Sequence, residues 1–182
     1  MDTRDGMKLL YSPEEIKKTV KRLAGELRPE MKGAPVFIGV LKGAFMFVSD
    51  LIRELNGAVE VDFIQAASYG LKDEPSTEVR IKGDITVDIK GRDVIIVEGI
   101  IDRGTTVRAV MGHLRKKGPA SVKVCTLLLR DSHAGMEIDY VGARVYEGFV
   151  VGYGMDYKEE YRNLPGIYIL EPPRPKAARI GR

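Results

Sequence analysis

Two acidic residues and a glycine–threonine turn follow one strongly apolar run of the chain. Four aliphatic residues at 94–97 precede Glu98, and Asp102 comes four positions later. The chain then enters a segment of helical periodicity through Arg103-Gly104-Thr105-Thr106. A turn at the start of a helix presents backbone N–H groups and hydroxyls to an anion, which predicts a phosphate monoester site. Glu98 and Asp102 would lie beside that phosphate and accept hydrogen bonds from sugar hydroxyls or a base N–H.

The same run has a plainer interpretation. A strand–turn–helix corner, with Asp102 as a simple helix cap, explains these residues equally well when no other motif is considered. The choice therefore depends on what the rest of the chain places around the turn.

The elements that must position these residues are predicted from caps and hydropathy periodicity. Ser12, Pro13 and Glu15 form a helix start with a capping box, and apolar residues at helical spacing continue the helix to Pro29. Further helices are expected at 44–55 and 105–117. Strands are expected at 36–41, 59–64, 94–97, 122–129, 140–141, 149–152 and 167–170. The stretch 68–91 is expected to be a long excursion with weak strands.

This order of elements predicts an α/β fold. Alternating strands and helices are typical of a mostly parallel, twisted sheet flanked by helices on both faces. With 182 residues, of which 44% are hydrophobic and 30% charged, the chain favours one domain. We expect that domain to span 1–171 and to be followed by a basic, flexible tail at 172–182.

Charge and rare residues exclude several classes of function. The net charge is +3, but the last nine positions carry four basic residues and no acid, so the remainder has a charge of −1. We therefore expect no nucleic-acid partner. One cysteine, Cys125 in an apolar run, predicts a buried thiol and excludes a disulfide framework. No signal peptide or run long enough to span a bilayer is visible, so a cytoplasmic protein without a membrane partner is expected.

Four segments of the chain, in order, resemble motifs of the phosphoribosyltransferases, in particular the 6-oxopurine (hypoxanthine–guanine) branch. Residues 94–106 resemble the motif that binds 5-phosphoribosyl 1-diphosphate (PRPP). Residues 40–44 (Val-Leu-Lys-Gly-Ala) resemble the diphosphate loop, and 67–70 (Ala-Ser-Tyr-Gly) resemble the start of the mobile catalytic flap. Residues 149–165 resemble the base-pocket and metal segment. The resemblance covers about 10–170 and implies a type I phosphoribosyltransferase fold with a small hood region.

The resemblance also implies a role for each matching residue. It assigns the diphosphate to Leu41, Lys42, Gly43 and Arg162, with a cis peptide between Leu41 and Lys42. It assigns the 5′-phosphate to Asp102, Arg103, Gly104, Thr105 and Thr106. It assigns the purine to Ile100, Arg130, Phe149, Val150 and Met155. Ser68 and Tyr69 would belong to the flap.

The implied chemistry is phosphoribosyl transfer from PRPP to purine N9, as in purine salvage. Asp102 would act as the general base, and Glu98 would contact the ribose. A Mg²⁺ ion carried by the diphosphate would bind Asp156 and Glu98. The partners would be PRPP and a purine base, and a homo-oligomer, a dimer or tetramer, is expected. The alternative is a phosphoribosyltransferase-fold sensor or regulator that binds nucleotide or PRPP with weak or no catalysis.

Three positions depart from the family pattern. Gly99 stands where the family has a second acid, Arg103 stands in place of a threonine or serine, and Arg130 aligns with a lysine that reads the purine 6-oxo group. These departures lie around the ribose and base, so they bear on activity and base choice more than on the fold. A carboxylate restored at position 99 is expected to lower KM for PRPP.

Overall fold

The computed structural model describes residues 6–69, 78–130 and 136–170. Six strands form one sheet in the order β4-β3-β2-β5-β6-β7. Their bounds are β2 (Val36–Leu41), β3 (Glu60–Tyr69), β4 (Glu78–Gly83), β5 (Asp93–Ile101), β6 (Ser121–Arg130) and β7 (Tyr140–Val145). All neighbouring pairs are parallel except β3 and β4. The predicted mostly parallel α/β sheet is confirmed.

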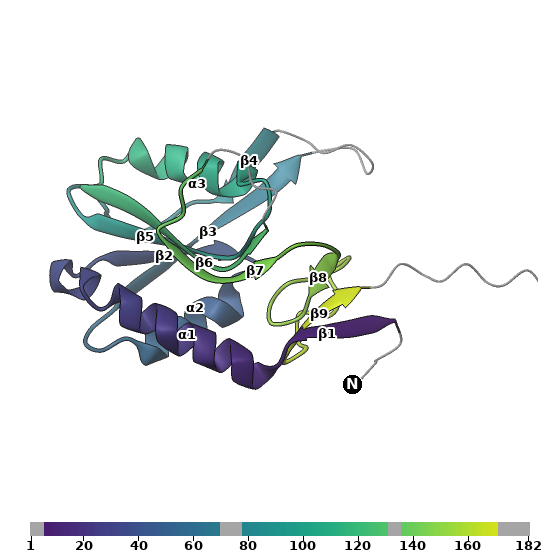
Figure 1. Ribbon diagram of the computed structural model, residues 1–182. Coiled ribbons are helices and arrows are strands. Elements are labelled where there is room, and N and C mark those ends of the chain that lie inside the picture. The colour runs from purple at the N-terminus through teal and green to yellow at the C-terminus, as the bar shows by residue number, and fades with distance from the viewer. Residues whose placement is uncertain (1–5, 70–77, 131–135, 171–182) are drawn as a thin grey trace, which may run out of the picture.

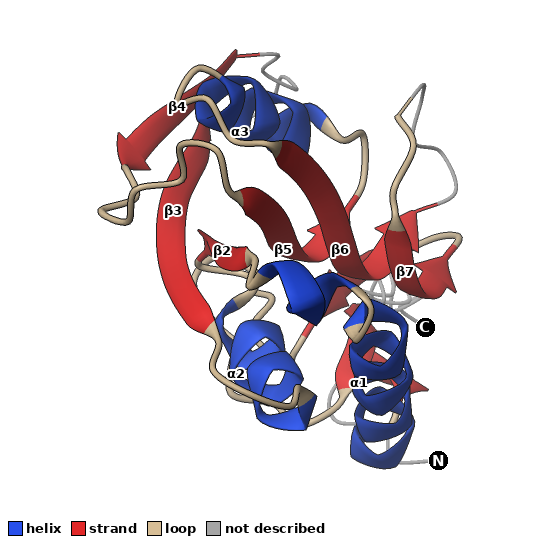
Figure 2. Cartoon of the chain, turned by 90° about the vertical axis from the view of Figure 1, so that its left-hand side faces the viewer, coloured by secondary structure: helices blue, strands red, loops and turns tan. Residues whose placement is uncertain are grey.

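Helices cover both faces of this sheet. The helices α1 (Pro13–Leu27) and α2 (Phe45–Glu54) lie on one face, and α3 (Thr105–Arg115) lies on the other (Figures 1 and 2). A short 3₁₀ helix, η1 (Glu30–Gly33), follows α1. The predicted capping box is present, since the Ser12 side chain accepts from the Glu15 N–H while the Glu15 carboxylate accepts from the Ser12 N–H.

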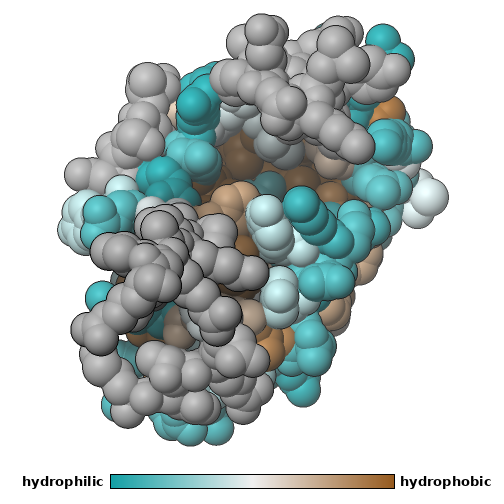
Figure 3. All heavy atoms as spheres, turned by 90° about the vertical axis from the view of Figure 1, so that its right-hand side faces the viewer, coloured by the Kyte–Doolittle hydropathy of each residue, from teal (hydrophilic) through white to brown (hydrophobic). Residues whose placement is uncertain are grey.

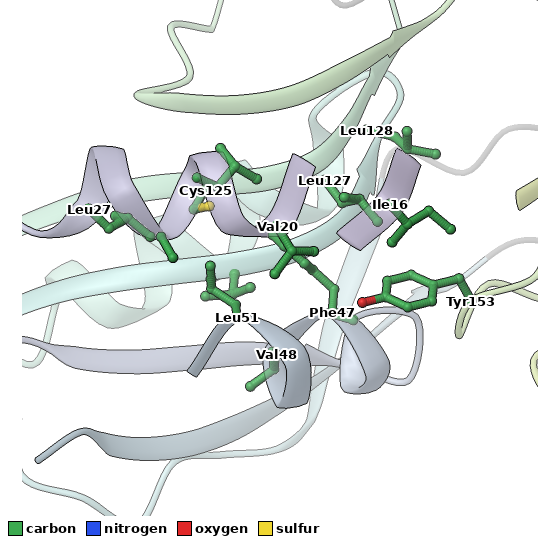
Figure 4. Close-up of a cluster of buried hydrophobic side chains, with 14 of the residues drawn as sticks. Ile16, Val20, Leu27, Phe47, Val48, Leu51, Cys125, Leu127, Leu128 and Tyr153 are labelled. Carbon is green, nitrogen blue, oxygen red and sulfur yellow. The ribbon is translucent and has the colours of Figure 1, made fainter. Parts of the chain in front are cut away.

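The core between the sheet and the first two helices is built from side chains far apart in sequence. Ile16 and Val20 of α1 meet Phe47 and Leu51 of α2 beneath β6, where the Cys125 thiol is fully buried (Figure 4). Burial raises the pKa of the Cys125 thiol well above its usual range, so it is an inert core group, as expected.

A second, three-stranded antiparallel sheet forms the small hood region. Its order is β1 (Met7–Tyr11), β9 (Ile167–Leu170) and β8 (Phe149–Val151). The sequence did not predict β1, because a five-residue strand carries little periodicity and its partner, β9, lies at the other end of the described chain. β9 lies between β1 and β8 and pairs with both, and Phe149 is the first residue of β8.

Several strands are longer than their hydropathy predicts. The expected end of β5 at residue 97 is wrong, because pairing with β6 continues through Glu98–Thr126 and Ile101–Leu129. Glu98 is therefore part of β5. β3 likewise extends to Tyr69 and pairs with β4.

Two expectations lie outside the described residues, namely the course of the flap through 70–77 and the tail at 172–182. No helix in the described part of the chain is long and apolar enough to cross a membrane.

Candidate active site

The expected site residues gather where β2, β5 and β6 end. These strands are parallel neighbours, so Lys42, Asp102 and Arg130 emerge at the same edge of the sheet. Ligands of parallel α/β sheets bind at this edge. In the view of Figure 3, hydrophobic side chains form the floor of a hollow that hydrophilic side chains border.

The turn after β5 has the geometry of an anion site. Gly104 is the N-cap of α3 with a φ of 70°, and no side chain caps the helix start. The first N–H groups of an α-helix have no partner within the helix, so these groups can bind a phosphate. Arg108 adds a cation that sequence reasoning missed, and its Nη2 donates to the Arg103 carbonyl at 2.6 Å. A basic residue one turn into a helix after a Gly-Thr-Thr turn was the available signal.

Arg130 joins the phosphate turn to the hood. Its Nε lies 3.3 Å from Asp102 Oδ1, and its Nη2 donates to the Gly148 carbonyl at 2.9 Å. The Asp102 side chain remains half exposed. The structure therefore places the expected general base, the expected base reader and the residue before Phe149 in one chain of contacts.

Two glycines, Gly99 of β5 and Gly154 between β8 and β9, let the loop at 40–44 approach the segments on either side of it. A Cβ built on Gly99 would lie 2.9 Å from the Gly43 carbonyl oxygen, and one built on Gly154 would lie 2.6 Å from the same oxygen. Both contacts are with backbone, so the loop itself would have to move. This geometry argues against the expectation that an acid at position 99 lowers KM for PRPP. The Leu41–Lys42 peptide in this loop is cis, as the resemblance implied.

Glu98 lies beneath that loop. Its side chain is 7% exposed, and its Oε1 accepts from the Gly99 N–H at 2.9 Å. Burial raises the pKa of Glu98 to about 8, against the opposing effect of the backbone N–H groups of Gly99 and Ile100. The buried Glu98 carboxyl is therefore harder to ionise than an exposed glutamate.

A hairpin between β8 and β9 carries the other two charged residues expected at the site, Asp156 and Arg162. Backbone bonds from Tyr153 to Leu164 and from Gly154 to Arg162 close it, and the Tyr153 hydroxyl donates to Asp50 of α2 at 2.5 Å. Within it, Arg162 Nη2 lies 2.7 Å from Asp156 Oδ1, and Arg162 Nη1 donates to the Gly154 carbonyl at 2.8 Å.

Glu159 completes this cluster and was missed by sequence reasoning. Its Oε2 lies 2.9 Å from Lys42 Nζ and 3.1 Å from Arg162 Nη2. The hydrogen bonds from Lys42 and Arg162 hold the pKa of Glu159 below its usual range. Its spacing of three residues from both Asp156 and Arg162 was the only local signal, because Lys42 comes from a distant segment.

The residues expected to bind a purine divide into two groups. Phe149 is 51% exposed, and Tyr157 packs edge-on against it with ring centroids 5.3 Å apart. Tyr157 was not anticipated, although its aromatic ring near Asp156 was a usable signal. By contrast, the Val150 and Met155 side chains are buried in the core, and Ile100 is partly buried against it. Ser68 and Tyr69 are the last two residues of β3.

The carboxylates expected to bind a magnesium ion are Asp156 and Glu98. Among residues of the described ranges, no three His, Cys, Asp or Glu side chains cluster to hold a metal. Asp156 is a partly exposed carboxylate whose Oδ2 accepts from the Glu159 N–H at 2.9 Å. Mg²⁺ is usually bound by one or two carboxylates together with substrate phosphates and water, so Asp156 fits a metal that arrives with diphosphate. Glu98 is buried beneath the loop at 40–44, so it is less accessible to such an ion than Asp156.

Comparisons with known proteins agree with this geometry. A family model described as "Phosphoribosyl transferase domain" matches residues 8–158. The chain is 44% identical over 175 residues to a hypoxanthine-guanine phosphoribosyltransferase of Bacillus subtilis. The alignment covers 94% of this chain and 97% of the relative.

Solved structures give the same result. A hypoxanthine phosphoribosyltransferase from Staphylococcus aureus superimposes with a TM-score of 0.85 at 38% identity and covers 91% of both chains. One from Trypanosoma cruzi superimposes with a TM-score of 0.87 at 35% identity and covers 94% of this chain and 95% of that one.

Proposed function

This chain belongs to the phosphoribosyltransferase family, and from that premise we propose that it transfers the 5-phosphoribosyl group of PRPP to N9 of a 6-oxopurine. The products would be a purine nucleoside monophosphate and diphosphate, as in purine salvage. Hypoxanthine and guanine are the bases that the names of its relatives indicate. Xanthine is a further candidate.

One observation carries the proposal, namely two separate anion sites that flank an acidic strand end. The start of α3 offers N–H groups and the hydroxyls of Thr105 and Thr106, while Lys42 and Arg162 form a second, cationic site. These sites follow β5 and β2, which are adjacent strands. PRPP carries a monophosphate and a diphosphate on one sugar, so two anion sites that follow adjacent strands suit it.

Asp102 lies where the reacting base would enter. As the sugar carbon develops positive charge and the base attacks, the purine N–H must lose its proton, and Asp102 would accept it. Lys42 and Arg162 would stabilise the charge that develops on the departing diphosphate. Arg103, Gly104 and the two threonines would hold the 5′-phosphate. Glu98 would accept hydrogen bonds from ribose hydroxyls.

Asp156 would hold a magnesium ion that accompanies the diphosphate. When bound, Mg²⁺ supplies further neutralisation of the diphosphate charge. Glu98 would be a second ligand only in its ionised form.

The purine would stack on Phe149 and lie next to the Val150 backbone. Arg130 would donate to the 6-oxo group, because its guanidinium lies between Asp102 and the hood. Met155 and Ile100 would support this pocket from the core. Ser68 and Tyr69 would lead the flap that excludes water from the reacting centre. A homo-oligomer, a dimer or tetramer, remains our expectation for the assembly.

A PRPP-dependent assay with Mg²⁺ across hypoxanthine, guanine, xanthine and adenine tests the proposal. We expect nucleotide formation with the oxopurines, at a higher kcat/KM than with adenine. Binding of PRPP without turnover of any of the four bases would instead support the alternative function, a sensor or regulator with the phosphoribosyltransferase fold. The departures from the family pattern at Gly99 and Arg103 are the reason for that alternative.

A further inference from the structure

The two cations expected to bind diphosphate converge on one carboxylate oxygen. Lys42 Nζ and Arg162 Nη2 lie 2.9 Å and 3.1 Å from the same atom, Glu159 Oε2. Lys42 and Glu159 are 117 positions apart in the chain, so the contact is a tertiary one. The oxygen therefore lies where an oxygen of a bound diphosphate would contact both cations.

We propose that Glu159 is a built-in competitor of diphosphate, whose carboxylate takes the place of a diphosphate oxygen between Lys42 and Arg162. The inference rests on the proposed function, since it requires that this cation pair binds diphosphate. Entry of PRPP would displace the Glu159 side chain, and departure of diphosphate would allow it to return.

The setting of Glu159 suits displacement. Its side chain is 66% exposed, and it lies on a hairpin turn where Lys158 and Glu159 both have positive φ values, 52° and 68°. Rotation of the Glu159 side chain into solvent therefore breaks two ion pairs but no core packing. Asp156 differs, because its side chain is 30% exposed and its two oxygens accept from Arg162 and from the Glu159 N–H.

Electrostatics explains why the two anions compete instead of binding together. A carboxylate and a diphosphate on the same pair of cations would repel each other at short range. The diphosphate carries more negative charge than the carboxylate, so it displaces Glu159 from Lys42 and Arg162. Its net affinity for the protein is reduced because the two ion pairs of Glu159 must be broken first. Glu159 would thus keep Lys42 and Arg162 facing each other while weakening product binding.

The test is the substitution Glu159→Gln, which keeps the shape and removes the charge. We expect the Kd of the Mg²⁺–diphosphate complex, measured by calorimetry, to fall about three- to tenfold, the range that loss of two exposed ion pairs allows. The inhibition constant of diphosphate against PRPP should fall in parallel. Glu159→Asp keeps the charge on a shorter side chain, so its Kd for the Mg²⁺–diphosphate complex should lie between those of the unchanged protein and Glu159→Gln.

Glu160→Gln is the matched control. Glu160 is exposed and adjacent, and its substitution changes the net charge equally. If Glu160→Gln tightens diphosphate binding as much as Glu159→Gln does, the effect is one of overall charge and the proposal fails. If Glu159→Gln weakens diphosphate binding, Glu159 organises the cations without competing, and the proposal also fails.

These outcomes are separate from the fate of the proposed function. Turnover of hypoxanthine and PRPP by the unchanged protein tests the function directly. A protein that turns over while Glu159→Gln leaves diphosphate binding unaltered would refute the competitor role alone.

Discussion

At the level of single residues, a contact joins Asp102, the proposed general base, to Arg130, the proposed reader of the purine. The carboxylate and the guanidinium lie 3.3 Å apart, and the same guanidinium reaches the Gly148 carbonyl of the hood. A substitution at either residue should therefore affect turnover, but only one of them should alter base preference.

Asp102→Asn should lower kcat by about 10²- to 10⁴-fold, the usual loss when a positioned general base is removed. The side chain is half exposed and asparagine is nearly the same shape, so the fold should be intact. Steady-state kinetics and a thermal melt of the variant check both statements. Retention of half the kcat or more would show that Asp102 is not the base.

Arg130→Met should reduce kcat/KM for hypoxanthine more than for adenine. A 6-oxo group left without its donor costs about 1–3 kcal/mol, whereas the 6-amino group of adenine faces Arg130 donor to donor. Loss of the contact with Asp102 will lower turnover of both bases, so the informative quantity is the ratio of the two kcat/KM values.

Arg130→Lys is the control for this prediction, because lysine also donates to a carbonyl. It should preserve the preference for hypoxanthine. An unchanged ratio in Arg130→Met would mean that Arg130 does not read the base.

At the level of elements, the site depends on how closely three segments approach one another. The Gly43 carbonyl lies between Gly99 of β5 and Gly154 of the hairpin, at positions where a Cβ would come within 2.9 Å and 2.6 Å of it. Protein interiors have little free volume, so a side chain at either position must displace the diphosphate loop.

Gly99→Ala should therefore lower the free energy of unfolding by about 1–3 kcal/mol and raise KM for PRPP. Gly99→Asp should do the same, although its carboxylate could accept from a ribose hydroxyl. Urea unfolding and PRPP saturation curves measure the two effects. Gly25→Ala is the control, because a Cβ on Gly25 of α1 meets nothing within 4 Å. A lower KM for PRPP in Gly99→Asp would contradict this prediction and show that the loop at 40–44 can move to accommodate a side chain.

At the level of the whole molecule, the burial of Glu98 makes stability depend on pH. The pKa of Glu98 is raised by burial from 4.5 to about 8 in the folded protein. Between those values the unfolded chain has lost a proton that the folded protein keeps. By linkage, the Glu98 contribution to stability falls as pH rises through this window and levels off above it.

Glu98→Gln stays neutral at every pH, so it should gain stability relative to the unchanged protein as pH rises from about 5 to about 8. Denaturant unfolding of both proteins at several pH values gives the difference in unfolding free energy. Glu160→Gln, at an exposed site, should show no such trend. A constant difference between Glu98→Gln and the unchanged protein would show that Glu98 is already ionised in the folded state.

Much of the fold could be predicted from the sequence, because the signals involved are local. The capping box at Ser12, the apolar run of β2 and the glycine turn before α3 each depend on residues within one turn or strand. Asp102, Lys42, Asp156 and Arg162 were proposed as site residues because short segments around them resemble family motifs.

What only the tertiary structure decided depends on segments distant in the chain. β1 exists because β9 pairs with it, and β5 extends past residue 97 because β6 continues the ladder. Burial beneath the loop at 40–44 raises the pKa of Glu98, and the Gly43 carbonyl of that loop occupies the space that a side chain at position 99 would need. The contact of Glu159 with Lys42 likewise has no local signature in the sequence. A sequence shows that both residues are charged, but it does not show which charged residues lie next to each other in the folded chain.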